Sequence, residues 1–218
     1  FPIVGIGASA GGLEAYRRLV EHLPTDTGMA FVLVQHLDPQ HRSLLAELIG
    51  SATRMPVTEA TDCLAVEPNR IYTIPPNVTL GILHGRLQIL ERIGERGRHL
   101  PVDDFFRSLA EDRGDQAIGV VLSGTASDGT AGLAAIKAAG GLTLVQDQVS
   151  AAYWGMPGSA VAAGCADLVL PPEEIAEELA RIARHPLLRQ RLLSESEPGD
   201  GAANALSKIY LLLRSRTG

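Results

Sequence analysis

The first residues of the chain combine a nucleophilic side chain with a turn that could present it. Phe1–Leu13 reads FPIVGIGASAGGL, in which an apolar run ends in a glycine-rich turn and an amphipathic segment follows. Ser9 lies between Gly7 and Gly11 and so matches the G-x-S-x-G pattern of a strand, a sharp turn and a helix. Small neighbours leave room for the turn, and the N-terminus of the helix favours negative charge beside Ser9. One interpretation of this spacing is a nucleophile for acyl transfer.

The same stretch permits two other interpretations. Its glycines also resemble a dinucleotide-binding fingerprint, in which a pyrophosphate approaches the backbone and Ser9 does no chemistry. It could equally be a small-residue turn that only packs a helix against a strand. By themselves these residues leave the nucleophile, the nucleotide loop and the packing turn open.

Two further polar residues follow predicted strands and could complete a site with Ser9. His36 comes after the apolar run 29–34, at the carboxyl end of a strand, where ligands bind in open α/β sheets. Asp128 lies in a small-residue loop between the apolar run 117–122 and an alanine-rich helical pattern. Taken alone, His36 could be a solvent-exposed strand end and Asp128 a helix N-cap. Together the three supply a nucleophile, a base and an orienting carboxylate, in a chain order unlike that of α/β-hydrolases.

These residues can meet only if the strands they follow share one sheet. Apolar strands are predicted at 3–6, 29–34, 117–122, 142–145 and 167–170, a short strand at 56–60, and helices at 12–22, 43–52, 101–112, 131–139, 151–164 and 171–183. Buried strands that alternate with helices indicate an α/β fold, here a doubly wound, Rossmann-like, mostly parallel sheet with helices on both faces. Such a sheet brings the carboxyl ends of distant strands to one edge.

The section from Cys63 to Glu91 differs from this pattern. Short runs joined by turns, among them Ile71–Ile74, Val78–Leu83 and Arg86–Leu90, predict a small antiparallel appendage on the parallel sheet. His84 lies at the expected hairpin tip, where we predict an exposed and inert side chain.

Composition limits the class of protein. With 218 residues and 45% hydrophobic content, the chain can bury one sizeable α/β core. A net charge of −6 argues against a nucleic-acid partner. Cys63 and Cys165 form neither a disulfide framework nor a metal-ligand spacing and predict free thiols in a reducing cytoplasm. The first apolar run is too short for a signal peptide or a membrane span. We expect a cytoplasmic protein that does not insert into membranes and needs no metal or cofactor.

Several motifs, in order along the chain, resemble the catalytic domain of CheB-type protein-glutamate methylesterases. They are Gly7-Ala8-Ser9-Ala10-Gly11-Gly12, Gln35-His36, Pro101-Val102-Asp103 with Phe106-Arg107-Ser108, Leu122-Ser123-Gly124 with Ser127-Asp128-Gly129, and Gly155-Met156-Pro157 with Ala160. The resemblance runs from Phe1 to about Leu170. It implies a Rossmann-like sheet with a small antiparallel hairpin, and it makes Ser9 the nucleophile, His36 the general base and Asp128 its partner.

The resemblance also implies a reaction and further site residues. The reaction is hydrolysis of glutamate γ-methyl esters on the helical bundle of a chemoreceptor-like protein, with release of methanol, and glutamine deamidation is a secondary expectation. Backbone N–H groups of Ala10 and Thr125 would form the oxyanion hole, although Thr125-Ala126 stands where the family usually has Met-Gly. Residues assigned to the substrate cleft are Gly124, Trp154 and Met156.

The C-terminal part predicts a change of domain. We expect a catalytic domain over 1–193, a linker rich in Ser, Glu, Gly and Ala over 194–204, and the start of a following domain over 205–218. The last segment resembles the beginning of a CheR-type receptor methyltransferase, so the chain looks like the esterase part of an esterase–methyltransferase fusion. The missing initiating Met and the abrupt end at Thr217-Gly218 indicate a fragment of a longer chain, and the receiver domain that the resemblance implies is absent before Phe1.

Two other functions stay open from the sequence. One is a nucleotide-binding oxidoreductase, with Asp38 as the residue that would bind the ribose, although no Lys follows Tyr153 at four residues' distance. The other is a module that binds a receptor and whose catalytic residues are silent.

Overall fold

The computed structural model describes residues 1–35, 45–91 and 100–184. The predictions made for His36, for Asp38 and for everything beyond residue 184 lie outside the described residues. Strands are β1 (Ile3–Ala8), β2 (Ala30–Gln35), β3 (Val57–Glu59), β4 (Ile71–Thr73), β5 (Val78–Leu83), β6 (Arg86–Glu91), β7 (Ala117–Val121), β8 (Leu142–Gln146) and β9 (Leu168–Leu170). Helices are α1 (Gly12–His22), α2 (Leu45–Ala52), α3 (Pro101–Arg113), α4 (Thr130–Ala138), α5 (Gly155–Ala162) and α6 (Pro172–Arg184), with a 3₁₀ turn at Gly114–Gln116.

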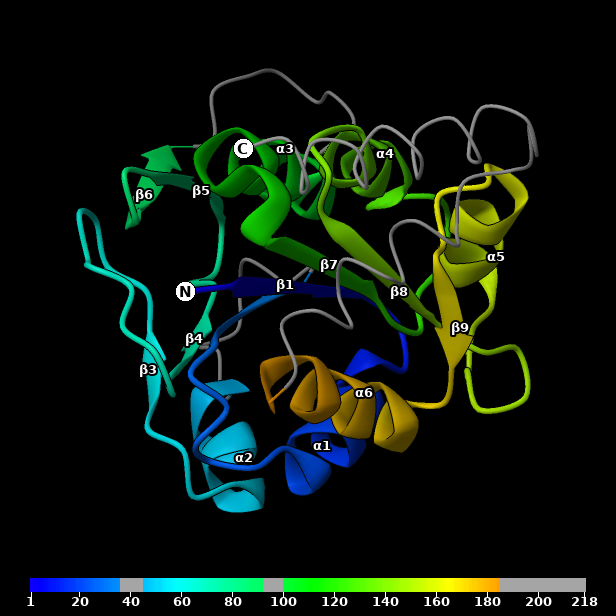
Figure 1. The fold of residues 1–218 in the computed structure, drawn as a ribbon, viewed down its shortest axis with the longest axis horizontal. Helices are drawn as coiled ribbons and strands as arrows, with labels where there is room; N and C mark the ends of the chain where they lie inside the picture. The colour runs from blue at the N-terminus through cyan, green and yellow to red at the C-terminus, as the bar shows by residue number, and fades with distance from the viewer. Residues whose placement is uncertain (36–44, 92–99, 185–218) are drawn as a thin grey trace, which may run out of the picture.

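The main sheet has the order β3-β4-β2-β1-β7-β8-β9, and its neighbouring strands pair in parallel (Figure 1). The predicted doubly wound parallel sheet is confirmed. From β1 the chain first builds outward through β2, and it later returns to β7 on the other side of β1. The strand order therefore reverses between β1 and β7. In open α/β sheets a crevice at the carboxyl ends of such a strand pair is the usual ligand site.

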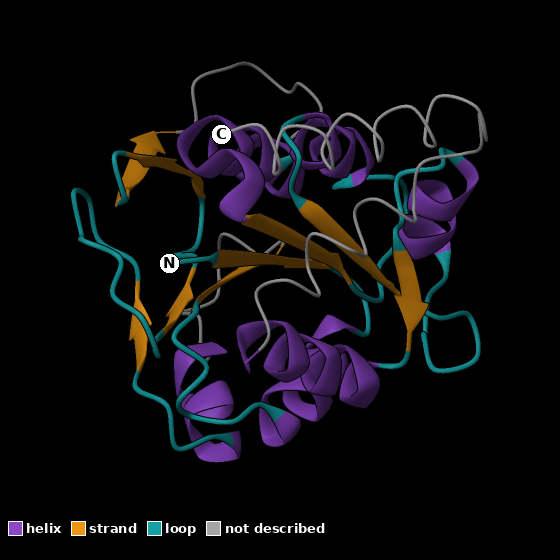
Figure 2. Cartoon of the chain, viewed as in Figure 1, coloured by secondary structure: helices purple, strands orange, loops and turns teal. Residues whose placement is uncertain are grey.

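Helices cover both faces of this sheet (Figure 2). Helices α1, α2 and α6 pack with Val4 and Ile6 of β1, whereas α3, α4 and α5 pack with Ile3 on the opposite face. Successive residues of a strand point to opposite faces, so a strand that is apolar throughout contributes side chains to the hydrophobic core on each face of the sheet. At Gly7 of β1, helix α3 lies so close to the strand that a side chain does not fit, because a Cβ at this position would overlap the side chain of Val102.

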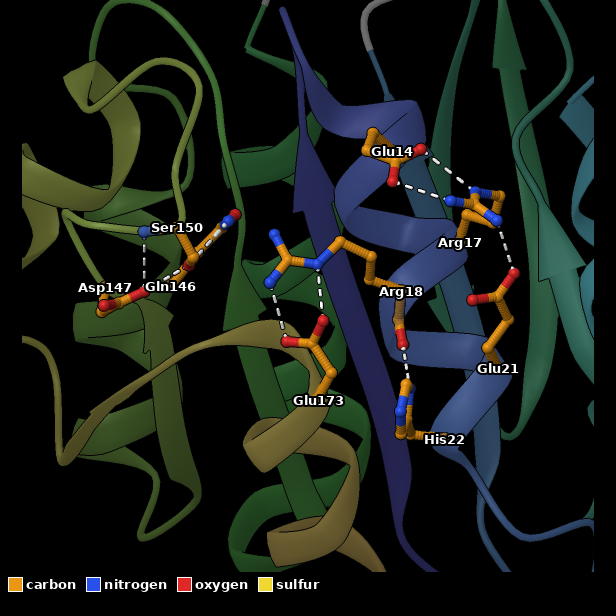
Figure 3. A network of polar contacts seen from close by, with 9 residues as sticks. All are labelled: Glu14, Arg17, Arg18, Glu21, His22, Gln146, Asp147, Ser150 and Glu173. Atoms are coloured by element: carbon orange, nitrogen blue, oxygen red, sulfur yellow. Dashed lines mark hydrogen bonds and ion pairs between the residues drawn. The ribbon is translucent and has the colours of Figure 1, made fainter.

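An ion pair ties together the two helices that lie under the first strand. The Arg18 guanidinium of α1 donates to both carboxylate oxygens of Glu173 in α6, at 2.6 and 2.9 Å (Figure 3). This bidentate pair is partly buried and joins segments far apart in sequence. The other Arg–Glu pairs of α1 are exposed, and such pairs contribute little stability. The Arg18–Glu173 pair therefore helps to hold α1, whose N-terminus follows the Ser9 turn.

One prediction for the strands is wrong. Ile71–Thr73 does not belong to an antiparallel appendage but is β4 of the parallel sheet, paired with β2 and β3. Its residues are buried, and parallel pairing with segments distant in sequence leaves no local signature. The antiparallel hairpin is β5–β6, and its turn is at His84–Gly85 as expected, with φ of 50° and 71°. His84 is exposed.

Within residues 1–35, 45–91 and 100–184, no helix combines the length and the hydropathy that a bilayer crossing requires.

Candidate active site

The turn after β1 places Ser9 at the carboxyl edge of the sheet, where the strand order reverses. The Ser9 N–H donates to the carbonyl of Ser123, which follows β7, at 3.0 Å, and the Ser9 carbonyl accepts from the Gly12 N–H at 2.9 Å. Gly11, which precedes α1, has φ of 72°, a left-handed conformation that glycine adopts without strain. These local features are those of the predicted strand–turn–helix.

The loop after β7 packs against this turn. A Cβ built on Gly124 would lie 3.1 Å from the Ser9 Cβ and would overlap Met156 Sδ. The Met156 N–H donates to the Gly124 carbonyl at 2.9 Å. Ser9, Gly124 and Met156, all predicted for the site, are therefore neighbours, and only a residue without a side chain fits between the other two.

Asp128 is buried, and hydrogen bonds to both of its carboxylate oxygens fix the orientation of the side chain. One of its carboxylate oxygens accepts from the backbone N–H groups of Asp103 and Gly129, both at 2.9 Å, and the other accepts from that of Val102 at 3.0 Å. Val102 and Asp103 are in the first turn of α3, so the carboxylate caps a helix that is remote in sequence. The positive end of α3 also favours the negative charge. The simple N-cap interpretation of Asp128 is thus incomplete, because its carboxylate joins the α4 loop to α3.

Asp103 makes the converse contact, from α3 to the N-terminus of α4. Its carboxylate accepts from the Gly132 N–H in the first turn of α4 at 2.7 Å, so α3 and α4 exchange caps. Neither helix has a side-chain cap from its own N-cap residue. Burial raises the pKa of Asp103, the Gly132 N–H opposes the rise, and the charge of Asp128 adds to it. Two buried carboxylates thus lie close together, with backbone N–H groups as their partners.

The Tyr16 hydroxyl lies beneath the ends of β1 and β2. It reaches the carbonyls of Val34, at 2.8 Å, and Ile6, at 3.1 Å. Burial raises the pKa of Tyr16 well above its ordinary value, so the phenol keeps its proton. Because Ala8 pairs in register with Gln35, β1 and β2 end at the same level of the sheet.

Comparison with known proteins decides the family. The family model described as CheB methylesterase matches residues 4–179. The chain belongs to the CheB methylesterase family. It is 40% identical over 185 residues to the protein-glutamate methylesterase/protein-glutamine glutaminase 2 of Xanthomonas oryzae pv. oryzae (strain MAFF 311018), a match that covers 83% of this chain and 51% of that protein. A protein-glutamate methylesterase/protein-glutamine glutaminase of Trichodesmium erythraeum (strain IMS101) is 37% identical, with 82% and 52% covered. The chain thus spans about half the length of these curated relatives.

A solved structure agrees with the family in fold. The CheB methylesterase catalytic domain of Thermotoga maritima superposes with a TM-score of 0.77 at 32% identity, over 83% of this chain and 98% of that one. The resemblance to CheB-type catalytic domains is therefore confirmed.

The residues that this family resemblance assigns to an oxyanion hole are both in loops beside Ser9. Ala10 follows Ser9 directly, and Thr125 follows Gly124. Among the described residues, neither of their N–H groups donates to a backbone carbonyl. Within the described part of the chain, no backbone carbonyl competes with a substrate oxygen for these N–H groups, and their assignment stays a prediction.

The two aromatic residues before α5 have different surroundings. The Trp154 ring packs against α5, the helix that Trp154 precedes, because a Cβ built on Gly158 would be 2.6 Å from the indole Nε1. Tyr153 is half-exposed and lies beside the nucleophile turn, because a Cβ built on Gly11 would be 3.2 Å from its ring. The prediction that Trp154 lines the CheB cleft stays untested, and Tyr153 is the aromatic residue that the structure places next to the turn.

Sequence reasoning also missed polar residues around the site. Ser123, Gln146 and Asp103 were not assigned to it. The signal was available for the first two, since each is a polar residue at or just after the carboxyl end of a buried strand. Asp103 carried no such signal, because an acidic residue in the first turn of a helix is ordinary.

No three His, Cys, Asp or Glu side chains are grouped as metal ligands would be, so far as the chain is described. Cys63 is exposed and Cys165 is buried, and both are free thiols.

The pair of buried carboxylates leads to a prediction about stability. Asp103→Asn retains an oxygen that can accept from Gly132 and removes a charge beside Asp128. Because the folded protein raises the pKa of Asp103, the stability contributed by this group is full at pH below the unfolded-state pKa and is lost as pH rises through the folded-state pKa. We expect the variant to gain free energy of unfolding relative to the parent as the pH rises above about 4, the ordinary pKa of an aspartate.

Urea unfolding at several pH values measures this difference. Asp104→Asn is the matched control, because Asp104 is in the same helical turn, is 43% exposed in its side chain and pairs with Arg107. A difference between the parent and Asp103→Asn that stays constant across the pH range would contradict the prediction.

Proposed function

We propose that the chain is a serine hydrolase that demethylates glutamate γ-methyl esters on a chemoreceptor-like protein and releases methanol. The main support is the position of Ser9, which lies at the reversal of strand order, against Gly124, in a chain whose relatives are named protein-glutamate methylesterase/protein-glutamine glutaminase. Asp128, held by three backbone N–H groups, supplies the oriented carboxylate such a site needs.

The proposed reaction begins with attack of the Ser9 hydroxyl on the ester carbonyl. His36 takes the Ser9 proton, and Asp128 orients and stabilises the imidazolium that forms. The pairing of Ala8 with Gln35 supports this step, because Ser9 and His36 follow these two residues. His36 then gives the proton to the leaving methanol, and a water molecule that His36 activates releases the glutamate from Ser9.

The second requirement of the reaction is that the negative charge developing on the carbonyl oxygen is stabilised. The backbone N–H groups of Ala10 and Thr125 would stabilise it, each by about 3 kcal/mol. A backbone donor survives replacement of the side chain, so Thr125 can serve where the family usually has Met.

Glutamine deamidation is a secondary proposal. The relatives' names include glutaminase, and an amide passes through the same acyl-enzyme with ammonia as the leaving group. The proposed substrate for both reactions is a receptor helical bundle. We further propose that residues 205–218 begin a CheR-like methyltransferase domain and that the protein acts in the cytoplasm.

The rival functions have less support. The comparisons favour neither an oxidoreductase nor a silent module. Moreover, the space beside Gly7 is occupied by Val102, so this glycine serves the packing of α3. We expect a titration with NAD or NADP to show no binding.

Chemical labelling tests the nucleophile. An alkyl fluorophosphonate reacts with an activated serine, and mass spectrometry of the digested protein locates the adduct. We expect the adduct on Ser9 and, in a parallel assay, release of methanol from a methylated chemoreceptor. No adduct, or an adduct on a different serine, contradicts the proposed nucleophile. An adduct on Ser9 without methanol release contradicts the proposed substrate.

A further inference from the structure

Ser123 connects the segments that surround the Ser9 turn. It follows β7 and is 1% exposed. Its carbonyl accepts from the Ser9 N–H at 3.0 Å, and its hydroxyl donates to the Ala10 carbonyl at 2.9 Å. The same hydroxyl accepts from the Tyr153 N–H at 3.0 Å. One buried side chain therefore joins the turn after β1 to the loop before α5.

These bonds determine how the Ala10 backbone is oriented. The peptide before Ala10 is held by the bond from the Gly12 N–H to the Ser9 carbonyl. The peptide after Ala10 is held by the Ser123 hydroxyl on the Ala10 carbonyl. A turn rich in glycine has many accessible backbone conformations, so its own residues do not hold a single orientation. Among the described residues, the Ser123 hydroxyl on the Ala10 carbonyl and the Ser123 carbonyl on the Ser9 N–H are contacts from outside the turn that select one.

The side chain of Gln146, at the end of β8, holds Ser123 in position. Its side-chain oxygen accepts from the Ser123 N–H at 2.8 Å, and its amide nitrogen donates to the Ser150 hydroxyl at 3.1 Å. Ser150 then donates to the Asp147 carboxylate (Figure 3). Gln146 is fully buried, and with a donor on one side and an acceptor on the other its amide has one satisfied orientation.

We propose that Ser123 is a positioning residue for this hydrolase: its carbonyl on the Ser9 N–H and its hydroxyl on the Ala10 carbonyl hold the peptides on both sides of the Ser9–Ala10 peptide, so that the Ala10 N–H is aimed at the substrate oxygen, and Gln146 fixes Ser123. The inference rests on the proposed function, since it assumes that Ser9 is the nucleophile. Its physical basis is that donors to a developing oxyanion are effective when they are already oriented before the reaction. A displacement of about 1 Å in such a group costs about 10²-fold in rate.

The test compares acylation of Ser9 in matched variants. Ser123→Ala removes the hydroxyl, and with a small aryl ester we expect kcat for acylation to fall about 10²-fold while KM changes little. Ser123→Thr keeps the hydroxyl and should recover most of the loss. Thr143→Val is the control: the Thr143 hydroxyl is also buried, donates to Asp167 and accepts from the Asp167 N–H, but it lies near the start of β8. This variant should acylate at the parent's rate.

Each outcome separates the positioning role from the proposed function. If the parent takes no fluorophosphonate adduct on Ser9, both are overturned. If Ser9 is labelled in the parent and Ser123→Ala acylates equally fast, only the positioning role is overturned. Should Ser123→Ala not fold, Gln146→Met keeps the Ser123 hydroxyl but removes the acceptor of the Ser123 N–H, so that the hydroxyl is no longer held in position. A lower kcat at unchanged KM in that variant supports the role, and an unchanged kcat overturns it.

Discussion

Ser9→Ala is expected to lower the rate of ester hydrolysis by about 10³-fold or more, because removal of a nucleophile leaves only the oxyanion donors and substrate binding to assist attack by water. The fold should be kept. The hydrogen bonds that the structure gives Ser9 in this turn, from the Ser9 N–H to the Ser123 carbonyl and from the Gly12 N–H to the Ser9 carbonyl, are made by its backbone. Alanine also fits the space, since the Ser9 Cβ is already the atom that faces Gly124.

Methanol release from a methylated receptor measures this loss, and urea unfolding shows whether the variant is intact. Ser51→Ala is the matched control, because Ser51 is exposed on α2 and its hydroxyl donates to the Leu48 carbonyl of its own helix. We expect the control to hydrolyse at the parent's rate. Parental activity in Ser9→Ala would refute the assignment of the nucleophile.

Asp128→Asn should reduce both activity and stability. The carboxylate uses both oxygens as acceptors for backbone N–H groups, whereas an asparagine side chain has one oxygen and one NH₂ group. In either orientation the NH₂ group faces a donor. A buried N–H left without a partner costs about 1–3 kcal/mol of the free energy of unfolding. Hydrolysis should fall about 10⁴-fold, because the neutral side chain neither orients the base correctly nor stabilises its charged form.

Asp167→Asn separates these two effects. The Asp167 side chain is 2% exposed, and its oxygens accept from Lys137 at 2.7 Å and from the Thr143 N–H at 2.9 Å. The substitution therefore disturbs a comparable buried carboxylate that is not part of the site. We expect a similar loss of stability with activity kept at temperatures where the variant is folded. If Asp128→Asn loses no more activity than Asp167→Asn, Asp128 has only a structural role.

Stability and chemistry are linked in this site through α3 and α4. Asp128 belongs to the loop that precedes α4 but caps α3, and Asp103 belongs to α3 but caps α4. The carboxylate that would orient the base is therefore also a contact between two helices. Such dual use means that variants at Asp128 must always be examined for folding before a change in rate is interpreted.

Much of the fold was predictable because its cause is local. Strands such as β1, β2 and β7 are apolar throughout, and segments with helical periodicity separate most of them, which is typical of a parallel sheet covered on both faces. β4 was misassigned because its partners are β2 and β3, and a short buried strand gives no sign of which neighbour it will join. The turn around Ser9 was predictable for the same local reason, since small residues and glycine conformations define it within a few positions.

The sequence by itself determined the nature of the elements, the strand–turn–helix around Ser9 and, through motifs in order, the resemblance to one family. Only the tertiary structure decided which groups lie together in the candidate site. Asp128 meets the N–H groups of Val102 and Asp103, Ser123 meets Ala10 and Gln146, and Tyr153 rather than Trp154 lies against the turn. These partners are distant in sequence, and hydrogen bonds form only within a few tenths of an ångström of the right distance. That precision comes from the packing of helices on the sheet, which no spacing of residues along the chain encodes.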